Sequence, residues 1–454
     1  MLEGLSNHAG FGARDFLKLN CPSRAVVTTA NIHRLAMTTF KSELREGWRD
    51  IVGAGIGLGC GIGAYTPVSS LFFRALEHEF NWSRGAATAA LIALPLTAAV
   101  LPIFGVVVDR IGVRRVAAAS ALAITACYLG LSFMTGTLLQ FYVLIVLLNV
   151  LGAGTGPITY TRQIAARFQA GRGAALACAL VGIAAAGMIL PAVLYHTLTV
   201  GGWRAGYSLM AILTLCGTVI ALLCIGNRKV DPARRSLEES GVSASQAART
   251  AAFWCLGLAI FFVSAATIGM VSQFQSLLIE KGFTPQRAAE LLSVLAAAVV
   301  ISRVVVGRTL DLGRPKQVAA AVLMLAAFGA AMWIGRPGTV GAIIGVLLFG
   351  FAIGAELDLL SFFIAACFGL RRYGVIYGWL GAFFYTGMAA GGLGYAVLHD
   401  RTGSYQFAIY GSVALLVVSA GLFLTLKVRG TEENGTKNQS FSPANTALNP
   451  KESP

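Results

Sequence analysis

The chain has 454 residues, of which 56% are hydrophobic and 12% charged, and its formal net charge is +15 at pH 7. Apolar stretches of about 18 or more residues recur along it, and each is long enough to cross roughly 30 Å of hydrocarbon as a helix. This composition indicates a multi-pass membrane protein. A basic chain can also signal nucleic-acid binding, but here the positive charges are spread through short loops between membrane-length runs, which argues against that partner.

Twelve apolar stretches follow one another, and we expect each to form one transmembrane helix. Their approximate bounds are 51–73, 85–108, 115–134, 138–161, 173–197, 204–226, 251–276, 287–310, 317–335, 339–364, 373–398 and 404–426. An even number of crossings places both termini on one side of the membrane. About 16 Lys and Arg residues fall in the loops after even-numbered stretches and about 7 in the others, so both termini are predicted to be cytoplasmic. We expect the protein in the bacterial inner membrane.

The longest loop between apolar stretches, 227–250, is polar and divides the twelve into six and six. We therefore expect an N-terminal six-helix half over 50–226 and a C-terminal six-helix half over 251–427, joined by a cytoplasmic linker. Residues 1–49 lack a long apolar run and so are not a secretory signal peptide. They are predicted to be a disordered cytoplasmic tail, as are the polar residues 428–454.

The two halves share features at an offset of about 200 residues, which favours an internal duplication. Gly105 and Asp109, after the second apolar stretch, correspond to Gly307 and Asp311 after the eighth. Parallel halves that face each other across a central cavity are an architecture of secondary transporters. We expect such a protein to work as a monomer.

The first apolar stretch carries glycine at alternate positions from 53 to 63. These glycines form two small-x-x-x-small ridges on opposite faces of a helix, a pattern typical of close packing against neighbouring helices. The alternative is a pliable helix that bends between two states of a transporter. A dinucleotide-binding loop is excluded, because the spacing does not give G-x-G-x-x-G.

One short segment, Gly105-x-x-x-Asp109-Arg110-x-Gly112-x-Arg114, joins two apolar stretches by a basic turn with one carboxylate. Glycines at 105 and 112 let neighbouring helix ends approach and turn. Asp109 at such an end can meet a helix N-terminus or a basic partner. The arginines suit contact with anionic lipid headgroups. Anchoring alone explains the segment, and so does a conformational latch that holds one transporter state.

This segment resembles the signature loop between helices 2 and 3 of the major facilitator superfamily, and Gly307-x-x-x-Asp311 resembles its C-terminal counterpart. The resemblance covers about residues 50–427. It implies an all-α membrane protein with twelve transmembrane helices in two six-helix halves. It also favours the latch, formed by Gly105, Asp109, Arg110, Gly112, Arg114 and Asp311.

Within the superfamily the chain resembles the monocarboxylate transporters and oxalate/formate antiporters. The segments that carry this resemblance are Phe80-Asn-Trp82-Ser83-Arg84, Arg172-Gly173-x-Ala175, Gly202-Trp203-Arg204-Ala-Gly-Tyr207 and Asp400-x-Thr402-Gly403-Ser-Tyr405. The chain departs from that branch at Val299, where the monocarboxylate pattern often has an acid, and its eleventh stretch lacks the lysine of oxalate exchangers. Both departures disfavour substrates with two carboxylates.

Arg303 is a basic residue well inside an apolar stretch. A charge at that depth costs about 2.5–3.5 kcal/mol on insertion scales, so it is expected to face protein or water and to have a partner. Its setting, Arg303-x-x-x-Gly307-x-x-x-Asp311, resembles the helix-8 pattern of the monocarboxylate branch, which implies that it binds the substrate carboxylate. A guanidinium suits this task because its planar fork takes a carboxylate in two parallel hydrogen bonds.

Two further charges lie in an apolar stretch and a third lies at the end of one. Glu356 and Asp358 stand two residues apart, about 200° around a helix, so we expect one to face the cavity and the other to face a neighbouring helix. One of them is a candidate proton carrier; the alternative is a fixed ion pair with Arg303 or with a helix end. Arg162 lies near the cytoplasmic end of the fourth stretch, and we expect its side chain to extend to the membrane interface.

Polar and aromatic side chains within the stretches complete the candidate substrate site. They are Tyr65, Tyr160, Gln273, Tyr377 and Tyr385. Packing explains each of them as well as binding does. If several line the cavity, the substrate is expected to have an apolar or aromatic body with an acid head.

The sequence therefore favours a secondary active transporter of a small organic anion, a monocarboxylate or aromatic acid, coupled to protons by alternating access. It has no G-x-x-x-x-G-K-[ST] loop, so an ATP-driven mechanism is not expected. It also lacks a nucleophile elbow, an H-E-x-x-H motif and cysteines at metal-binding spacing, so we expect no enzyme activity, metal or cofactor. Drug or neutral-solute transport within the same superfamily is the alternative, and a non-transporting membrane sensor is a remote one.

Overall fold

The computed structural model describes residues 29–82, 93–169, 171–225 and 241–427, and these are almost entirely helical. Helix ends are set by local signals. Thr250 and Thr284, for example, each accept a hydrogen bond from the backbone N–H three residues further on and so cap the helices that follow them.

The helices of the N-terminal half follow the expected apolar stretches. They are α1 (Thr29–Cys60), η1 (Ile62–Ala64), η2 (Thr66–Val68), α2 (Ser69–Phe80), α4 (Ala93–Ile111), α5 (Val113–Ser132), α6 (Leu138–Gly152), η4 (Ala153–Thr155), α7 (Pro157–Arg167) and α8 (Arg172–Cys224). At 53 residues, α8 would be about 80 Å long if straight, so it holds two membrane crossings. The joint between them is Gly202, whose φ is 69°.

The helices of the C-terminal half are more regular. They are α10 (Ala244–Ala248), α11 (Ala251–Ser272), α12 (Phe274–Glu280), α13 (Pro285–Leu310), α14 (Pro315–Ala331), α15 (Thr339–Phe368), α16 (Tyr373–Thr402) and α17 (Gln406–Thr425). Each of the six apolar stretches expected in this half falls on one of these helices or, for the seventh stretch, on α11 and α12 together.

Seven helical segments of the described chain are each long and apolar enough to cross a membrane, and the pair Lys41–Cys60 and Ile62–Phe80, bent by 53°, makes an eighth. α8 supplies two of the expected crossings, and α4, α14 and α16 cover three more of the apolar stretches. The described helices are therefore consistent with twelve crossings.

The first and fourth crossings are interrupted at neighbouring points. α1 gives way to η1 and η2, and α6 gives way to η4. The hydroxyl of Thr155 accepts a hydrogen bond from the N–H of Ile62 at 3.0 Å and donates to the carbonyl of Gly152 at 2.8 Å. Thr155 thus satisfies one backbone donor of the first break and one backbone acceptor of its own, and non-helical backbone at membrane depth needs such partners. The glycine-rich first stretch therefore bends.

The same stretch also packs closely, so the two interpretations of its glycines are compatible. A Cβ built on Gly59 would lie 2.7 Å from the carbonyl oxygen of Gly182 in α8. One boundary needs correction: α1 begins at Thr29, so residues 29–49, expected to be part of a disordered tail, are helical. The predicted disorder of residues 1–28 and 428–454 concerns segments outside the described residues.

The end of the expected linker lies against the C-terminal half. Residues 226–240 are outside the described part of the chain. Beyond them, Gly241 forms an isolated antiparallel bridge with Gly369, which lies between α15 and α16, and α10 follows.

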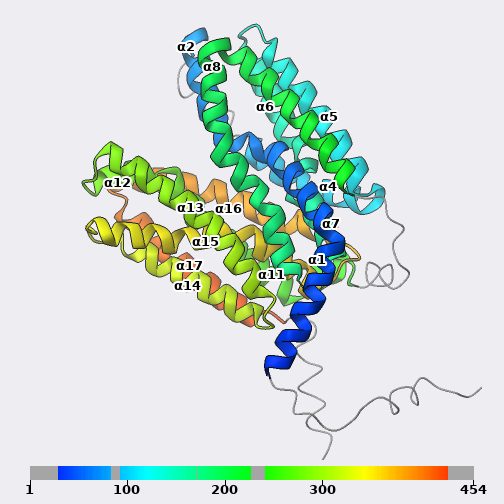
Figure 1. Ribbon diagram of the computed structural model, residues 1–454. Helices are drawn as coiled ribbons and strands as arrows, with labels where there is room; N and C mark the ends of the chain where they lie inside the picture. The colour runs from blue at the N-terminus through cyan, green and yellow to red at the C-terminus, as the bar shows by residue number, and fades with distance from the viewer. Residues whose placement is uncertain (1–28, 83–92, 170, 226–240, 428–454) are drawn as a thin grey trace, which may run out of the picture.

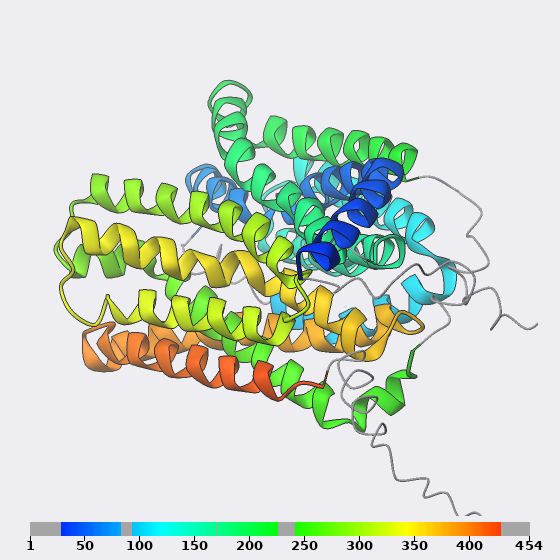
Figure 2. The same cartoon turned by 60° about the horizontal axis from the view of Figure 1, so that its bottom comes forward.

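The two halves form two groups of helices. Figure 1 shows the N-terminal helices, blue to green, and the C-terminal helices, green to red, lying together near the labels α1, α7 and α11 and diverging toward the labels α2 and α12. Figure 2 shows the same division after rotation. We call the end at which the halves meet the closed end. Contacts between the halves there and a cavity beyond it make up the candidate site.

Candidate functional site

Asp109 joins the two halves at the closed end. It follows the apolar part of α4, and its carboxylate accepts hydrogen bonds from the N–H groups of Gly374 and Val375, both at 3.0 Å, at the start of α16. Arg162 of α7 donates from Nε to the same carboxylate at 2.8 Å. The side chain of Asp109 is only 1% exposed. A negative charge at a helix N-terminus is stabilised by the helix dipole and by unpaired N–H groups.

The sequence led us to expect that Arg162 extends to the membrane interface. In the structure its guanidinium instead binds Asp109. Its side chain is 23% exposed and is held by Asp109. The reason is that the chain folds a buried carboxylate next to it, and a charged hydrogen bond within the protein competes favourably with the interface.

Asp311 makes the corresponding contact from the C-terminal half. Its two carboxylate oxygens accept the N–H groups of Gly173 at 2.8 Å and Ala174 at 2.9 Å, at the start of α8. Burial raises the pKa of Asp311 from its ordinary value, while these two hydrogen bonds and the charges of Arg308 and Arg172 act in the opposite direction. Each half thus places one aspartate on the N-terminus of a helix in the other half.

Glycine makes the close approach at the closed end possible. A Cβ at Gly105 would collide with the backbone carbonyl of Gly374, and a Cβ at Gly173 would collide with the carbonyl of Gly307. The four glycines and the two aspartates are related by the offset seen in the sequence. We refer to the contacts of Asp109 and Asp311 with these helix N-termini as the paired latch.

The remaining residues of the signature loop have different environments. Gly112 links α4 to α5 with a φ of 88°, a conformation that favours glycine. Arg110 is exposed, and Arg114 donates to the backbone carbonyl of Ile225, at the end of α8. Gly112 thus shapes the turn and Arg114 ties it to the end of α8, whereas Asp109 makes the contact between the halves.

Tyr373 adds a buried hydrogen bond at the closed end that the sequence did not indicate. Its hydroxyl donates to the hydroxyl of Thr161 at 3.1 Å, across the two halves, and lies 3.3 Å from the carbonyl oxygen of Ser361. Tyr373 is fully buried. A tyrosine at a helix end is common, so nothing in its sequence context marks this role.

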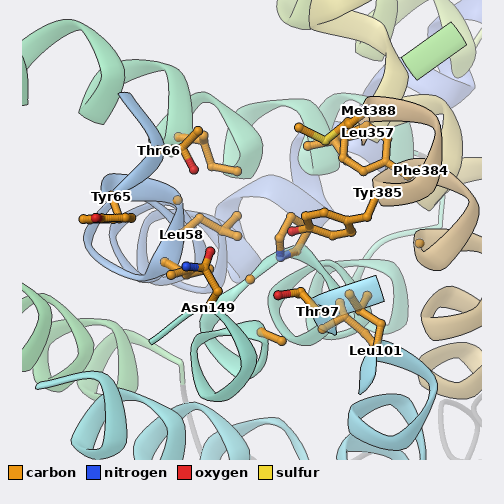
Figure 3. Close-up of a pocket in the computed structure, with 18 of the residues that line it drawn as sticks. Leu58, Tyr65, Thr66, Thr97, Leu101, Asn149, Leu357, Phe384, Tyr385 and Met388 are labelled. Atoms are coloured by element: carbon orange, nitrogen blue, oxygen red, sulfur yellow. The ribbon is translucent and has the colours of Figure 1, made fainter. Parts of the chain in front are cut away.

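A cavity of about 410 Å³ lies between the halves (Figure 3). Its wall is mostly apolar and includes Leu58, Ile62, Phe73, Leu101, Ile145, Ile158, Leu357, Leu360, Phe384 and Met388. Its charged lining residues, among those the structure describes, are Arg303 of α13 and Glu356 of α15. Its volume falls in the range typical of small-molecule sites. We call it the central cavity.

Arg303 is 5% exposed and has an incomplete set of partners. Its Nη1 lies 3.5 Å from Oδ1 of Asp358 in α15. Within the described residues, its Nε and the Oδ2 of Asp358 are buried without a hydrogen-bond partner. Such unsatisfied groups are rare in folded proteins because each carries an uncompensated desolvation cost. The guanidinium thus has capacity for another acceptor.

The two carboxylates of α15 lie in different places. Glu356 lines the central cavity, and its Oε2 accepts a hydrogen bond from the hydroxyl of Thr267 in α11 at 3.0 Å. Asp358 is not among the cavity-lining residues and faces Arg303. Both are almost fully buried, at 4% and 1% exposed.

Three of the predicted tyrosines also line the central cavity: Tyr65, Tyr377 and Tyr385. The hydroxyl oxygens of Tyr65 and Tyr377 are fully buried, so these two residues offer ring surface to the cavity. Figure 3 shows Tyr385 extending its ring into the space between the halves, and this residue is only half-buried. Its hydroxyl is therefore the most available of the three.

The structure does not bring Tyr160 or Gln273 to the central cavity. Tyr160 is fully buried against the first crossing, where a Cβ at Gly57 would collide with its ring. Gln273 lies at the joint of α11 and α12 and accepts a hydrogen bond from the hydroxyl of Tyr405 at 3.3 Å. Packing, the alternative left open by the sequence, accounts for Tyr160, and Gln273 is held by the hydrogen bond from Tyr405.

The sequence analysis did not predict the neutral polar residues of the cavity wall. Thr97 of α4 and Asn149 of α6 are two of them (Figure 3). Threonine and asparagine occur singly in many apolar stretches, so no sequence signal separates these two from the rest.

The comparisons with known proteins agree with this geometry. A profile of the Major Facilitator Superfamily matches residues 51–392. The chain belongs to the Major Facilitator Superfamily. The resemblance of the signature loop is therefore confirmed at the level of the superfamily, as is the expected all-α membrane fold. The superfamily also makes the chain a membrane transporter and not an enzyme.

Solved structures of other transporters share the fold. The Escherichia coli fucose:proton symporter FucP has a TM-score of 0.66 at 14% identity, with 82% of this chain and 97% of that chain covered. The proton:xylose symporter XylE has a TM-score of 0.66 at 15% identity, covering 84% and 96%. The human organic anion transporter MFSD10 has a TM-score of 0.62 at 16% identity, covering 83% and 99%. A search of curated proteins returned no significant match. The comparisons do not identify the branch of the superfamily.

Proposed function

We propose that this superfamily member is a secondary active transporter of a small organic anion, a monocarboxylate or aromatic acid, that moves together with protons by alternating access. The observation that carries the proposal is Arg303, a buried guanidinium in the cavity wall with one long ion-pair contact and an unpartnered Nε. A substrate carboxylate would complete its hydrogen bonds. The apolar and aromatic wall favours an apolar body on the same substrate.

The charges of the site favour coupling to protons. Arg303 contributes one positive charge, and Glu356 and Asp358 contribute two negative charges when ionised. A substrate carboxylate would add a further negative charge beside ionised Glu356, and burying both charges in so apolar a cavity costs free energy. Protonation of Glu356 removes one negative charge from the cavity wall when the anion enters. Asp358 does not line the cavity and faces Arg303, so of the two carboxylates it is the better counter-ion for that guanidinium.

The paired latch favours alternating access within one chain. Asp109 and Asp311 hold the halves together at the end that the loop charges assign to the cytoplasm. The proposed state is therefore outward-open, in a bacterial inner membrane with both termini inside. Because both contacts and the described cavity wall lie within one chain, we propose that a monomer suffices for the cycle.

Transport of a neutral solute, such as a sugar, is the second candidate. It is favoured by the contact between Arg303 and Asp358, which neutralises the guanidinium without any substrate. FucP and XylE, which share the fold, are named as sugar symporters, and MFSD10 as an organic anion transporter. At their low identities these names favour neither candidate.

Counterflow in vesicles separates the two. Purified protein would be reconstituted, loaded with an excess of unlabelled solute and supplied with the same labelled solute outside. We expect transient accumulation with monocarboxylates or aromatic acids and none with hexoses, pentoses or cationic drugs. Accumulation of a sugar with no response to any acid would overturn the proposed anion specificity.

A further inference from the structure

The polar residues of the central cavity are divided between the halves by chemistry. Its charged lining residues, within the described chain, come from the C-terminal half: Arg303 from α13 and Glu356 from α15. The N-terminal half contributes neutral polar groups, among them Thr97 from α4 and Asn149 from α6. A molecule that touches both halves therefore meets a charged wall on one side and a neutral polar wall on the other.

Thr97 presents an acceptor to the cavity. Its hydroxyl donates its only hydrogen to the carbonyl oxygen of Ala93, one turn earlier in α4, at 2.8 Å. A hydroxyl oxygen has two lone pairs as well as one hydrogen. With the hydrogen engaged, the oxygen can only accept.

Asn149 presents an acceptor as well. Its side-chain Nδ2 donates to the carbonyl oxygen of Ile145, one turn earlier in α6, at 2.9 Å. Because that carbonyl can only accept, the orientation of the amide is fixed by chemistry. The amide oxygen, and one remaining amide hydrogen, are left for another partner.

We infer that Thr97 and Asn149 form a subsite for a hydroxyl group on the substrate, at the end of the molecule opposite its carboxylate. A hydroxyl donates to an acceptor and can itself accept from the free amide hydrogen, so it matches what the two residues offer. A carboxylate matches less well: it could accept the free amide hydrogen, but it has no hydrogen to donate to the oxygens of Thr97 and Asn149. This division orients the substrate: the acid lies on the C-terminal half and the hydroxyl on the N-terminal half.

The inference rests on the proposed function and names its substrate class: a hydroxylated monocarboxylate with an apolar or aromatic body. Such a molecule would bind both halves at once. Contacts with both halves are what a substrate needs if its binding is to change the relative position of the two.

The test is equilibrium binding of benzoate, 4-hydroxybenzoate and 4-methoxybenzoate to the purified full-length protein. The methoxy compound keeps the oxygen but cannot donate a hydrogen bond. We expect the hydroxy acid to bind about three- to tenfold more tightly than either of the others, the effect of about one neutral hydrogen bond. Equal affinities for the hydroxy and methoxy acids would overturn the subsite.

Variants then locate the effect. In Asn149→Leu we expect the advantage of the hydroxy acid over benzoate to fall to within about twofold. The matched control is Gln140→Leu, the same type of change on the same helix at a residue that does not line the cavity and accepts from Thr135 instead. If Asn149→Leu does not fold, Thr97→Val removes the other acceptor with little change in shape. A hydroxy-acid advantage that persists in the folded variants contradicts the subsite.

The outcomes also separate this inference from the proposed function. If the wild-type protein binds none of the three acids, the anion proposal fails. If it binds all three with the same affinity, the anion proposal stands and the hydroxyl subsite fails.

Discussion

Three charged side chains are buried near the central cavity: Arg303, Glu356 and Asp358. Burying such charges costs free energy unless they are paired. Removing one partner of a buried ion pair typically costs about 3–5 kcal/mol, because the other charge is then left without compensation. Yet Arg303 and Asp358 are joined by one contact of 3.5 Å, and each keeps a buried atom without a partner. A pair that served stability alone would be expected to make fuller contact, so the loose geometry suits a site that exchanges partners.

For the proton carrier, we expect Glu356→Gln to abolish uphill uptake driven by a pH gradient while substrate exchange persists. The amide keeps the shape and the contact with Thr267 but cannot take up or release a proton. The measurement compares pH-driven accumulation with exchange in the same vesicles.

Asp358→Asn is the comparison for that variant. It leaves Arg303 without its counter-ion, so we expect a lower yield of folded protein, consistent with a loss of about 3–5 kcal/mol. Retention of pH-driven accumulation by Glu356→Gln, with its loss in a folded Asp358→Asn protein, would assign coupling to Asp358.

The sequence could identify these charged residues because charge at membrane depth is rare and costly. It could not place Tyr160 and Gln273, since tyrosine and glutamine pack as readily as they bind, and it could not single out Thr97 and Asn149. The contact of Arg162 with Asp109 was also missed, because it depends on how α4 and α7 pack and not on the sequence around either residue.

At the scale of elements, the contacts between the halves lie at helix ends. α8 and α16 begin at the closed end with N–H groups that have no partner within their own helices. Asp311 and Asp109 accept those hydrogen bonds from the opposite half, so each contact exists only while the halves are together. Opening the closed end must break both.

We expect Asp109→Asn and Asp311→Asn to slow transport while leaving substrate affinity within a few fold. Each change removes a charged acceptor from a helix N-terminus, and a charged hydrogen bond contributes about 1.5–3 kcal/mol, so the balance between the two states should shift by about tenfold or more. Initial rates of exchange and equilibrium binding would be measured together.

Asp400→Asn is the matched control for the latch. It is the same substitution at an exposed residue near the other end of α16. The latch variants could instead lose equilibrium binding while the balance between the outward-open and inward-open states stays unchanged. That result would show that the two aspartates act at the substrate site and not between the halves.

The helix breaks were less predictable than the helices. The twelve apolar stretches all fall on helices where the chain is described, since length and hydropathy suffice to define a crossing. The interruptions in the first and fourth crossings meet at a hydrogen bond between Thr155 and Ile62, which are distant in the sequence. The alternate glycines indicated that the first helix could bend, but not where.

At the scale of the whole molecule, the contact between the halves occurs twice. Gly105 and Asp109 contact the start of α16, and Gly307 and Asp311 contact the start of α8, at positions related by the same offset along the chain. Two copies of one contact give the molecule an end that closes symmetrically. The central cavity has no such symmetry, because its charged residues come from one half.

A cysteine accessibility experiment tests this arrangement. In a cysteine-free background, we expect Thr66→Cys, at the cavity lining beyond the first helix break, to react with a membrane-impermeant maleimide added outside the cell. Ser361→Cys, buried at the closed end, should stay unreactive from the same side. The opposite pattern would reverse the proposed orientation.

The most direct test of the account is the binding of an aromatic monocarboxylate to wild-type protein, Arg303→Lys and Arg303→Ala. Lysine keeps the positive charge but loses the planar fork, so we expect binding at least about tenfold weaker, or roughly 1.4 kcal/mol. In Arg303→Ala we expect no detectable binding or uptake. Arg303→Lys is expected to keep its expression, which shows that the protein still folds with a changed side chain at this position. Wild-type affinity and full anion uptake in Arg303→Ala would contradict the organic-anion assignment and make neutral-solute transport the better account.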